Sequence, residues 1–565
     1  MKKIVAGILI LNTLFLYGCK NDSDDTNSNK TSIGTDTTQA ELNILNSLVF
    51  PKNNPEGLSG NLRLEESGTT YNPEAVIPPQ CYTKHEGQYN PCMTCHQTYP
   101  FKSRPNQMND GGLQREYAFS DLGTQNHWKN LFEDRTDAMA QITDQQVIDY
   151  IYTDNYSPLI TQLKTSSDWQ GSIPEIENLQ QGEAAFDEHG FAQDGSGWVA
   201  FSYKPLPSTF WPTNGSTDDV MIRLPESFRT SACDSETLSK DTYLANLSIL
   251  EASIKKLDSI STPPIDENKI CTDLNGDGIM NIVEQINQQK FYVGNAHSIE
   301  VTEMLYPLGT QFLHTVRYVG IKSDGEITIP ARMKEVRYME KFKFLTPTEL
   351  ISRYGKERQE KIDELLPKYT HRGDKGTDNG FGWMVQGFIE AEDGHLRKQS
   401  EEEHLFCMGC HTTIGTTIDD TFAFPRKVTG AEGWKYISLK GMKDAPMVNG
   451  SAEGEIKHYL RTVGGGNEFR ENPEILQRFF NDDGTLNDDA LTQAKDVYDL
   501  ITPSVRRALD LNKAYMTIVK DQDFIHGRDA NLGVSKNVYE SVDNKTPVLP
   551  EENTVPWDIR LNWAD

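Results

Sequence analysis

The stretches Cys92-Met93-Thr94-Cys95-His96 and Cys407-Met408-Gly409-Cys410-His411 decide how this chain is interpreted, because both have the form Cys-x-x-Cys-His. This pattern is typical of covalent haem attachment, in which two thiols bond to the porphyrin and the adjacent histidine becomes the proximal ligand of the iron. We therefore predict two covalently bound haem c groups, attached to the thiols of Cys92, Cys95, Cys407 and Cys410, with His96 and His411 on the irons.

Three other uses of a Cys-x-x-Cys pair compete with haem. A redox disulfide would need a thioredoxin-like strand–helix context, which neither motif has. Zinc is disfavoured because the two cysteine pairs lie more than 300 residues apart, unlike the pairs of compact zinc modules. Two structural disulfides would be strained and would leave both histidines unexplained. Haem attachment alone uses all six residues.

The N-terminal residues predict export and lipid attachment. Met1-Lys2-Lys3 is basic, and the apolar run from Ile4 to Tyr17 is too short for an ordinary membrane span. The run ends in Leu16-Tyr17-Gly18-Cys19, which resembles a bacterial lipobox. The resemblance implies a signal peptide over residues 1–19 and lipidation of Cys19. Lys20, which follows, favours the outer membrane, facing the periplasm or the cell surface; a plain secretory signal is the alternative.

Composition limits the possible partners. Residues 20–45 are mainly polar and are expected to form a flexible tether, because they offer too little apolar surface to fold. The remaining residues, more than 500, are too many for one core. The formal net charge of −28 argues against nucleic acid as a partner. It is compatible with a basic redox partner protein, although solubility explains it equally well.

The cysteine count predicts one disulfide. Of the eight cysteines, one is assigned to lipid and four to haem, which leaves Cys81, Cys233 and Cys271. Cys233 and Cys271 bracket a helix expected at about 240–257, and we predict that they pair. Cys81 is either a free buried thiol or a thiolate ligand of iron. His85 is a further candidate iron ligand, although a solvated loop position is the simpler expectation.

A loose repeat follows the two motifs. Met139 precedes a helix that begins near Thr143, and Met447 precedes one that begins near Ser451. The order of haem motif, methionine and helix resembles the minimal class I cytochrome c fold over residues 92–153 and 407–463. The resemblance implies that Met139 and Met447 are distal iron ligands, with core packing as the alternative. The other candidates for that role are Met108, His127, Met442 and His404.

Residues 273–284 match the loop of an EF-hand, with a helix expected to follow through residue 289. We predict a structural Ca²⁺ bound by oxygens of Asp273, Asn275, Asp277, Ile279 (through its carbonyl), Asn281 and Glu284. The alternative is a turn rich in Asn and Gly that binds no metal.

Residues 297–344 are rich in Val, Ile, Tyr and Thr, which predicts two to four antiparallel strands. Ser323-Asp324-Gly325-Glu326 is a favourable hairpin turn between two of them. His314, at the start of one strand, either reaches a haem edge or packs in the core. Thr346-Pro347 then opens a helix that is expected to run to about residue 366.

These observations predict a mainly α fold with two cytochrome c-like haem modules and a β-containing insert that carries the EF-hand loop. The expected boundaries are signal peptide 1–19, tether 20–45, N-terminal haem domain 46–230, insert 231–296, β-rich segment 297–345 and C-terminal haem domain 346–565. The favoured function is that of a diheme c-type cytochrome transferring electrons in the periplasm or at the cell surface. The alternative is a peroxidase-like diheme oxidoreductase with one open haem site, and a haem-bearing surface binding protein is a third class.

Overall fold

The structure, a computed structural model, describes residues 36–55, 57–58, 64, 72–98, 104–233, 238–465, 470–521 and 524–564. Cys19 and the predicted signal peptide lie outside these residues. Among the residues that are described, no helix is both long enough and apolar enough to cross a membrane.

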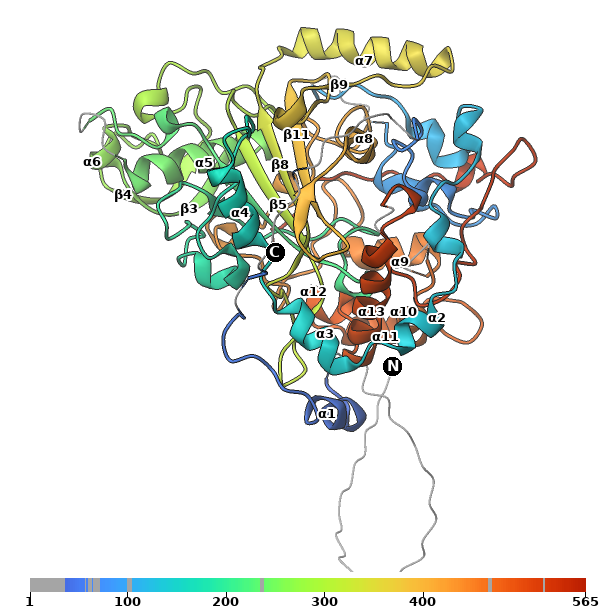
Figure 1. The fold of residues 1–565 in the computed structure, drawn as a ribbon. Helices are drawn as coiled ribbons and strands as arrows, with labels where there is room; N and C mark the ends of the chain where they lie inside the picture. The colour runs from blue at the N-terminus through green and yellow to red at the C-terminus, as the bar shows by residue number, and fades with distance from the viewer. Residues whose placement is uncertain are drawn as a thin grey trace, which may run out of the picture.

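An eight-stranded antiparallel sheet forms the centre of the described part of the molecule (Figure 1). Its order is β1-β2-β5-β8-β11-β10-β9, and β12 pairs with β11 beside this path. The strands are β1 (Val199–Ala200), β2 (Thr217–Arg223), β5 (Gln311–Arg317), β8 (Met333–Lys341), β9 (Thr370–His371), β10 (Thr377–Asp378), β11 (Trp383–Glu390) and β12 (Leu396–Lys398). The sheet thus joins strands from three of the predicted segments.

The two faces of this sheet have different surroundings: one packs against a helix and the other lines a cavity. Side chains alternate between the faces of a strand, so the register fixes which residues share a face. Met221, Leu313 and Val336 point to the face that packs on helix α4 (Tyr156–Thr165), within a core cluster of buried residues. The register places His314 opposite Arg337 on the other face, where both line a cavity.

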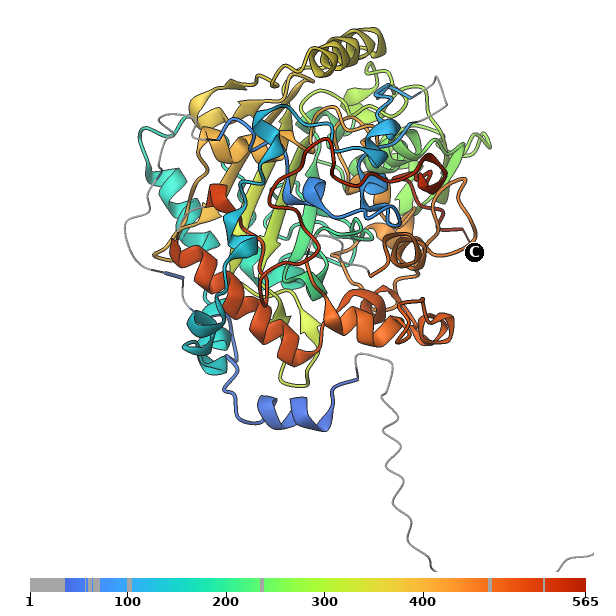
Figure 2. The ribbon, with the colours of Figure 1, turned by 90° about the vertical axis from the view of Figure 1, so that its right-hand side faces the viewer.

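Helices cover the sheet and its ends. Helix α5 (Lys240–Lys255) is buried along most of its length and packs on the hairpin of β3 (Ser259–Asp266) and β4 (Ile282–Asn287). Figures 1 and 2 show α7 (Pro347–Ile362) at one end of the sheet and α13 (Val505–Asp521) at the other. The remaining elements are α1 (Gln39–Leu45), α2 (Thr136–Ala140), α3 (Asp144–Ile151), α6 (Glu267–Ile270), α8 (Glu401–Met408), α9 (Glu455–Val463), α10 (Pro473–Phe479), α11 (Asp488–Gln493), α12 (Val497–Ile501), β6 (Gly320–Ile321) and β7 (Ile327–Thr328).

The prediction of a mainly α fold is wrong. Its failure has a physical cause, because the central strands are covered on both faces and therefore lack the alternation that marks a half-exposed strand. Every residue of β11 is buried, for example, and the sequence analysis places this segment in a helical haem domain. The predicted helix at 240–257 is confirmed as α5, and the helix opened by Thr346 is confirmed as α7, which begins with a capping box.

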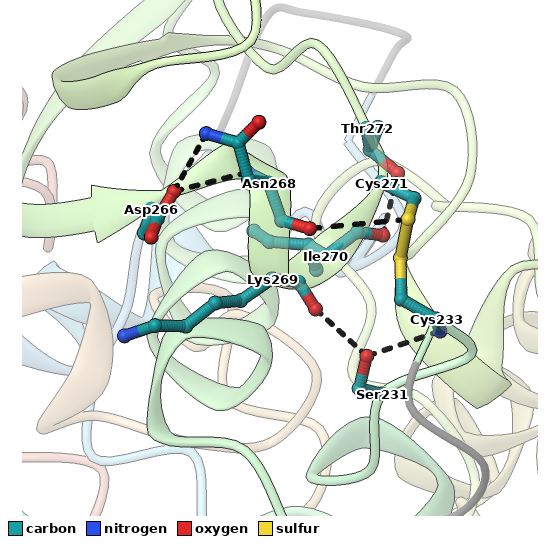
Figure 3. The surroundings of a disulfide bond; sticks show 8 residues. All are labelled: Ser231, Cys233, Asp266, Asn268, Lys269, Ile270, Cys271 and Thr272. Carbon is teal, nitrogen blue, oxygen red and sulfur yellow. Dashed lines mark hydrogen bonds between the residues drawn. A yellow bond between two sulfur atoms is a disulfide. The ribbon is translucent and has the colours of Figure 1, made fainter.

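A disulfide joins Cys233 to Cys271 in the structure (Figure 3). It ties the segment before α5 to the residue that follows α6, at a sequence separation of 38. The Ser231 hydroxyl reinforces the link, because it donates a hydrogen bond to the carbonyl of Lys269 (2.8 Å) and accepts one from the backbone N–H of Cys233 (3.1 Å). The disulfide therefore links the two ends of the segment that contains α5, β3 and α6.

Candidate functional site

Both Cys-x-x-Cys-His motifs line one cavity of about 790 Å³. Cofactor and ligand sites are typically roughly 300–1,000 Å³, so this cavity has the size of a binding site. Its wall comes from one face of the sheet, from the segment that carries the first motif, and from α8 with the residues after it. Figure 2 shows the segment that carries the first motif, in blue, and the C-terminal coil, in dark red, in front of the sheet.

The first motif is positioned by the C-terminal coil. Its residues 91–94 form a short 3₁₀ helix, and Cys92, Cys95 and His96 line the cavity. The side chain of Gln97 donates to the carbonyl of Val555 (3.0 Å) and accepts from the backbone N–H of Trp557 (2.9 Å). The residue next to His96 is therefore tied to a segment from the far end of the chain.

His96 has a carboxylate partner. Its Nδ1 lies 3.1 Å from Oδ2 of Asp110, whose side chain is only 4% exposed. When Nδ1 carries the proton and donates it to this carboxylate, the lone pair of the ring lies on Nε2. A carboxylate in this position also makes an imidazole a stronger metal ligand. His96 thus has the tautomer and the orientation of a ligand.

The second motif begins in α8, which starts at a Ser400–Glu403 capping box and ends at Met408. Cys407 lies in its last turn, and Cys410 and His411 follow directly. Nδ1 of His411 lies 2.8 Å from the backbone carbonyl oxygen of Asp420, a neutral acceptor. Burial lowers the pKa of His411 to about 4, so the imidazole is neutral at physiological pH, as a metal ligand must be.

The two motif regions are directly connected. The side chain of Asn106 donates to the carbonyl of Ile414 (2.7 Å), and the backbone N–H of Gly415 donates to Asp110 (3.4 Å). Asp110 therefore contacts both the histidine of the first motif and the loop after the second.

The donor set fits covalent haem. None of the four motif cysteines is in a disulfide, and all four line the cavity together with both histidines. Each histidine uses Nδ1 in a hydrogen bond, which leaves Nε2 for iron. Four thiols and two oriented imidazoles at one cavity are the groups that two haem c molecules require.

The predicted distal methionines are not at the cavity. Met139 lies in α2, in a cluster with residues of α13, and Met447 is buried in the main core with 6% of its surface exposed. Met447 therefore fills core space and Met139, which is half-buried, packs against a core cluster, in line with the packing alternative that the sequence leaves open. Neither lines the cavity. Of the other methionine candidates, Met108 lines it, whereas Met442 is a core residue.

The histidine candidates are placed differently from expectation. His404 uses both ring nitrogens, because Nδ1 lies 3.0 Å from the Thr377 hydroxyl and Nε2 accepts from the backbone N–H of Gly387 (3.2 Å). It therefore has no nitrogen left for iron. His85 is fully buried, with Nε2 3.1 Å from the sulfur of Cys92, so the expectation of a solvated loop position is wrong. His127 is partly buried and does not line the cavity.

The sheet contributes a polar wall that the sequence analysis largely missed. Oδ2 of Asp218 accepts hydrogen bonds from the Tyr203 hydroxyl and from Nε2 of His314 (3.2 Å). All three residues line the cavity. Burial and the neighbouring Asp218 raise the pKa of Tyr203 well above its usual value, so the phenol keeps its proton. Of these three residues, the sequence pointed to His314 alone.

A second polar cluster lies on the same wall. Glu335 accepts a hydrogen bond from Nε of Arg337 (2.7 Å) and another from Arg528. Burial opposes ionisation of Glu335, but the two guanidinium groups outweigh it and lower its pKa to about 2. One sequence signal could have indicated this cluster. It is the pair of charged residues at 335 and 337, which are two positions apart in an otherwise buried strand and so share one face.

Cys81 is the fifth thiol at this cavity. Burial raises its pKa well above the usual value for a thiol, and the neighbouring Cys92 and Cys410 raise it further. Cys81 is not in a disulfide. It therefore sits as a protonated thiol beside both motifs.

The predicted calcium loop is a compact turn whose carboxylates bind its own backbone. Asp273 accepts hydrogen bonds from the N–H groups of Gly276 (2.7 Å) and Gly278 (2.8 Å), and Asp277 accepts one from Ile279 (2.7 Å). The element that follows is strand β4 and not the expected helix. Throughout the part of the chain that the structure describes, no three or more His, Cys, Asp or Glu side chains are grouped to hold a metal ion. Calcium binding stays a prediction.

Comparison with known proteins identifies the family of this chain. A family model whose description reads "-like lipoprotein" matches residues 66–499. The chain belongs to this lipoprotein family. An uncharacterized lipoprotein of Aquifex aeolicus (strain VF5) is 31% identical over 594 residues, an alignment that covers 93% of this chain and 98% of the relative. No solved structure matches the chain. As a lipoprotein, the protein is associated with a membrane through a lipid anchor.

The lipoprotein match corrects the resemblance to diheme c-type cytochromes with class I cytochrome c-like modules. The family match runs through both motifs and the whole region between them, and the fold is built on one antiparallel sheet. The helices expected after the motifs exist as α3 and α9, but the preceding methionines pack in or against core clusters and not at the cavity. The resemblance was wrong because it rested on short local patterns, whereas long-range strand pairing determines this fold.

Proposed function

We propose that this lipoprotein is a redox protein that holds two covalently attached haems in one cavity and transfers electrons outside the cytoplasm. The observation that carries the proposal is that two Cys-x-x-Cys-His motifs, far apart in sequence, line the same cavity with both histidines oriented through Nδ1. When bound, haem iron would supply one-electron redox chemistry.

The residues of the chain have distinct parts in this proposal. Cys92 and Cys95 would hold one haem, and Cys407 and Cys410 the other. Asp110 and the carbonyl of Asp420 keep the two histidines in the tautomer that binds iron. The C-terminal coil, through its hydrogen bonds to Gln97, keeps the first motif against the cavity.

The test is a count of covalent haem in protein purified from a host that attaches haem c. A pyridine haemochrome assay is expected to give two haems per chain, and the Cys95→Ala and Cys410→Ala variants should each lose or weaken one attachment. Cys81→Ala is the matched control, because it also removes a buried cavity thiol but lies outside both motifs. Wild-type protein that contains no haem, or zinc in its place, would overturn the proposal.

A second candidate is an oxidoreductase with one open haem site. Two observations favour it: neither Met139 nor Met447 lines the cavity, and the hydrogen-bonded group of Tyr203, Asp218 and His314 does. An electron carrier needs both irons closed, whereas an enzyme needs a vacant position. Carbon monoxide binding to the reduced protein, followed by its visible spectrum, separates the two, because only an open site binds it.

Location and partner complete the proposal. The lipobox ending at Cys19 and the following Lys20 support attachment to the outer membrane, facing the periplasm or the cell surface. The net charge of −28 supports a basic redox partner protein, since opposite charges steer association. Partner binding that weakens as ionic strength rises would support this part of the proposal.

A further inference from the structure

Arg337 lies in the middle of β8 with unused hydrogen-bond donors. Its Nε donates to Glu335, but neither Nη1 nor Nη2 donates a hydrogen bond to any residue that the structure describes. The side chain is only 15% exposed and lines the cavity. Native proteins rarely leave buried donors unpaired, and a guanidinium group carries four N–H bonds on these two nitrogens. The position therefore favours an acceptor that enters the cavity.

His314 is the cross-strand neighbour of Arg337 in the sheet register. Its Nε2 is used by Asp218, whereas Nδ1 makes no hydrogen bond within the described chain. The ring of Phe210 contacts both residues, at 5.0 Å from the His314 ring and 5.2 Å from the Arg337 guanidinium carbon. One imidazole nitrogen and one guanidinium group thus flank the same aromatic ring on the cavity wall.

The carboxylates of this wall are already satisfied. Glu335 is shared by Arg337 and Arg528, and Oδ2 of Asp218 is shared by Tyr203 and His314. These two negative groups are balanced by their own partners, so the edge of Arg337 formed by Nη1 and Nη2 is left without a hydrogen-bond acceptor among the described residues. Such an edge matches a planar oxyanion, to which it can donate two parallel hydrogen bonds.

We propose that Arg337 and His314 form a binding site for a small oxyanion of the carboxylate type. Such a group has two sources, a free anion that enters the cavity or a propionate of a haem bound there, and the second source rests on the proposed function. Arg337 lines the same cavity as Cys407 and Cys410, which form the second attachment point. The chemistry of recognition is the same in both cases.

The experiment uses formate as the probe and the full purified protein. Formate binding is measured by isothermal titration calorimetry for wild type, Arg337→Gln and Arg358→Gln, and haem midpoint potentials are measured on the same samples. Arg358 is the matched control, because it also lines the cavity but is exposed on α7, where it donates to the carbonyl of Gln107 (2.9 Å). Both variants remove one positive charge.

Two results support the site and identify its occupant. For a free anion, wild type binds formate and Arg337→Gln weakens binding about tenfold or more, as expected for loss of a charge-assisted pair, while Arg358→Gln does not. For a propionate, wild type does not bind formate, and Arg337→Gln alone lowers a haem midpoint potential.

Equal behaviour of Arg337→Gln and Arg358→Gln in both measurements overturns the site. If Arg337→Gln does not fold, Arg337→Lys replaces it, since lysine keeps the charge and loses the paired donors. A haem count on the same samples separates this inference from the proposed function. Protein without haem that binds formate through Arg337 refutes the function alone, and protein with neither haem nor formate binding refutes both.

Discussion

If the two motifs each hold a haem, as proposed above, replacing Asp110 by Asn tests whether the two haems differ in reduction potential. The motifs have the same form, but His96 donates to a buried carboxylate and His411 donates to a neutral carbonyl. A carboxylate partner makes an imidazole more basic, which stabilises ferric iron and lowers the reduction potential. The amide side chain of the Asp110→Asn variant would keep an oxygen acceptor at the same place and remove only the charge.

The size of the effect follows from the hydrogen bond. Hydrogen bonds to charged groups contribute about 1.5–3 kcal/mol and neutral ones about 0.5–1.5, so Asp110→Asn removes about 1–1.5 kcal/mol of stabilisation from the ferric state. For a one-electron couple, about 1.4 kcal/mol corresponds to about 59 mV. We therefore expect the potential of the haem on His96 to rise by about 40–60 mV, with the other potential unchanged.

Spectroelectrochemical titration of wild type, Asp110→Asn and Asp121→Asn measures this shift. Asp121 lies in the same segment and its exposed side chain is not part of the cavity wall, so its substitution controls for the loss of one negative charge. An unchanged lower potential in Asp110→Asn, or an equal rise in Asp121→Asn, would refute the role given to the Asp110–His96 hydrogen bond.

The remaining predictions concern the disulfide, calcium, lipid and pH. Replacing Cys233 and Cys271 by Ala should lower the free energy of unfolding by up to about 4 kcal/mol on the chain-entropy estimate for a 38-residue loop, as urea unfolding would show; a loss near zero would contradict this. If Ca²⁺ binds at 273–284, calcium should raise the Tm of wild type and Glu284→Ala should abolish this rise; a wild-type Tm that does not change with chelator would argue for a turn that binds no metal. Cys19→Ala should move the protein from the detergent phase to the aqueous phase in Triton partitioning, and unchanged partitioning would exclude Cys19 as the lipid site. The folded-state pKa of Glu335, about 2, lies below the ordinary glutamate value of 4.5, so its ion pairs stabilise the protein above about pH 4.5 and lose this effect as pH falls toward 2. Glu335→Gln should therefore lose less stability than wild type over that range in acid unfolding followed by circular dichroism.

Local sequence signals predicted local structure well. The capping box at Thr346 gave the start of α7, and the turn at residues 323–326 connects β6 and β7 as expected. The capping box at Thr143 is likewise present at the start of α3. Each of these elements is determined by residues within a few positions of one another, so a short stretch of sequence contains the necessary information.

The sheet and the shared cavity could not be predicted in this way. Strand β2 pairs with β5 across about ninety residues, and the two motifs meet across more than three hundred. The separation of the motifs in sequence argues against a shared metal site, yet folding brings both motifs to one cavity. No sequence pattern near Asp110 indicates that its carboxylate contacts His96 and the backbone of Gly415. These contacts depend on how distant segments of the chain fold over the sheet.

Net charge and the cavity wall give different information about what this lipoprotein binds. The chain carries −28 overall, which disfavours the approach of anions at long range. The wall, in contrast, presents unused donors on Arg337, while its carboxylates Glu335 and Asp218 are occupied by other side chains. An anion in this cavity would therefore be selected by paired hydrogen bonds at short range and not by electrostatic steering. Composition therefore argues against nucleic acid as a partner but cannot indicate an interior anion site, since such a site depends on which donors remain unpaired after folding.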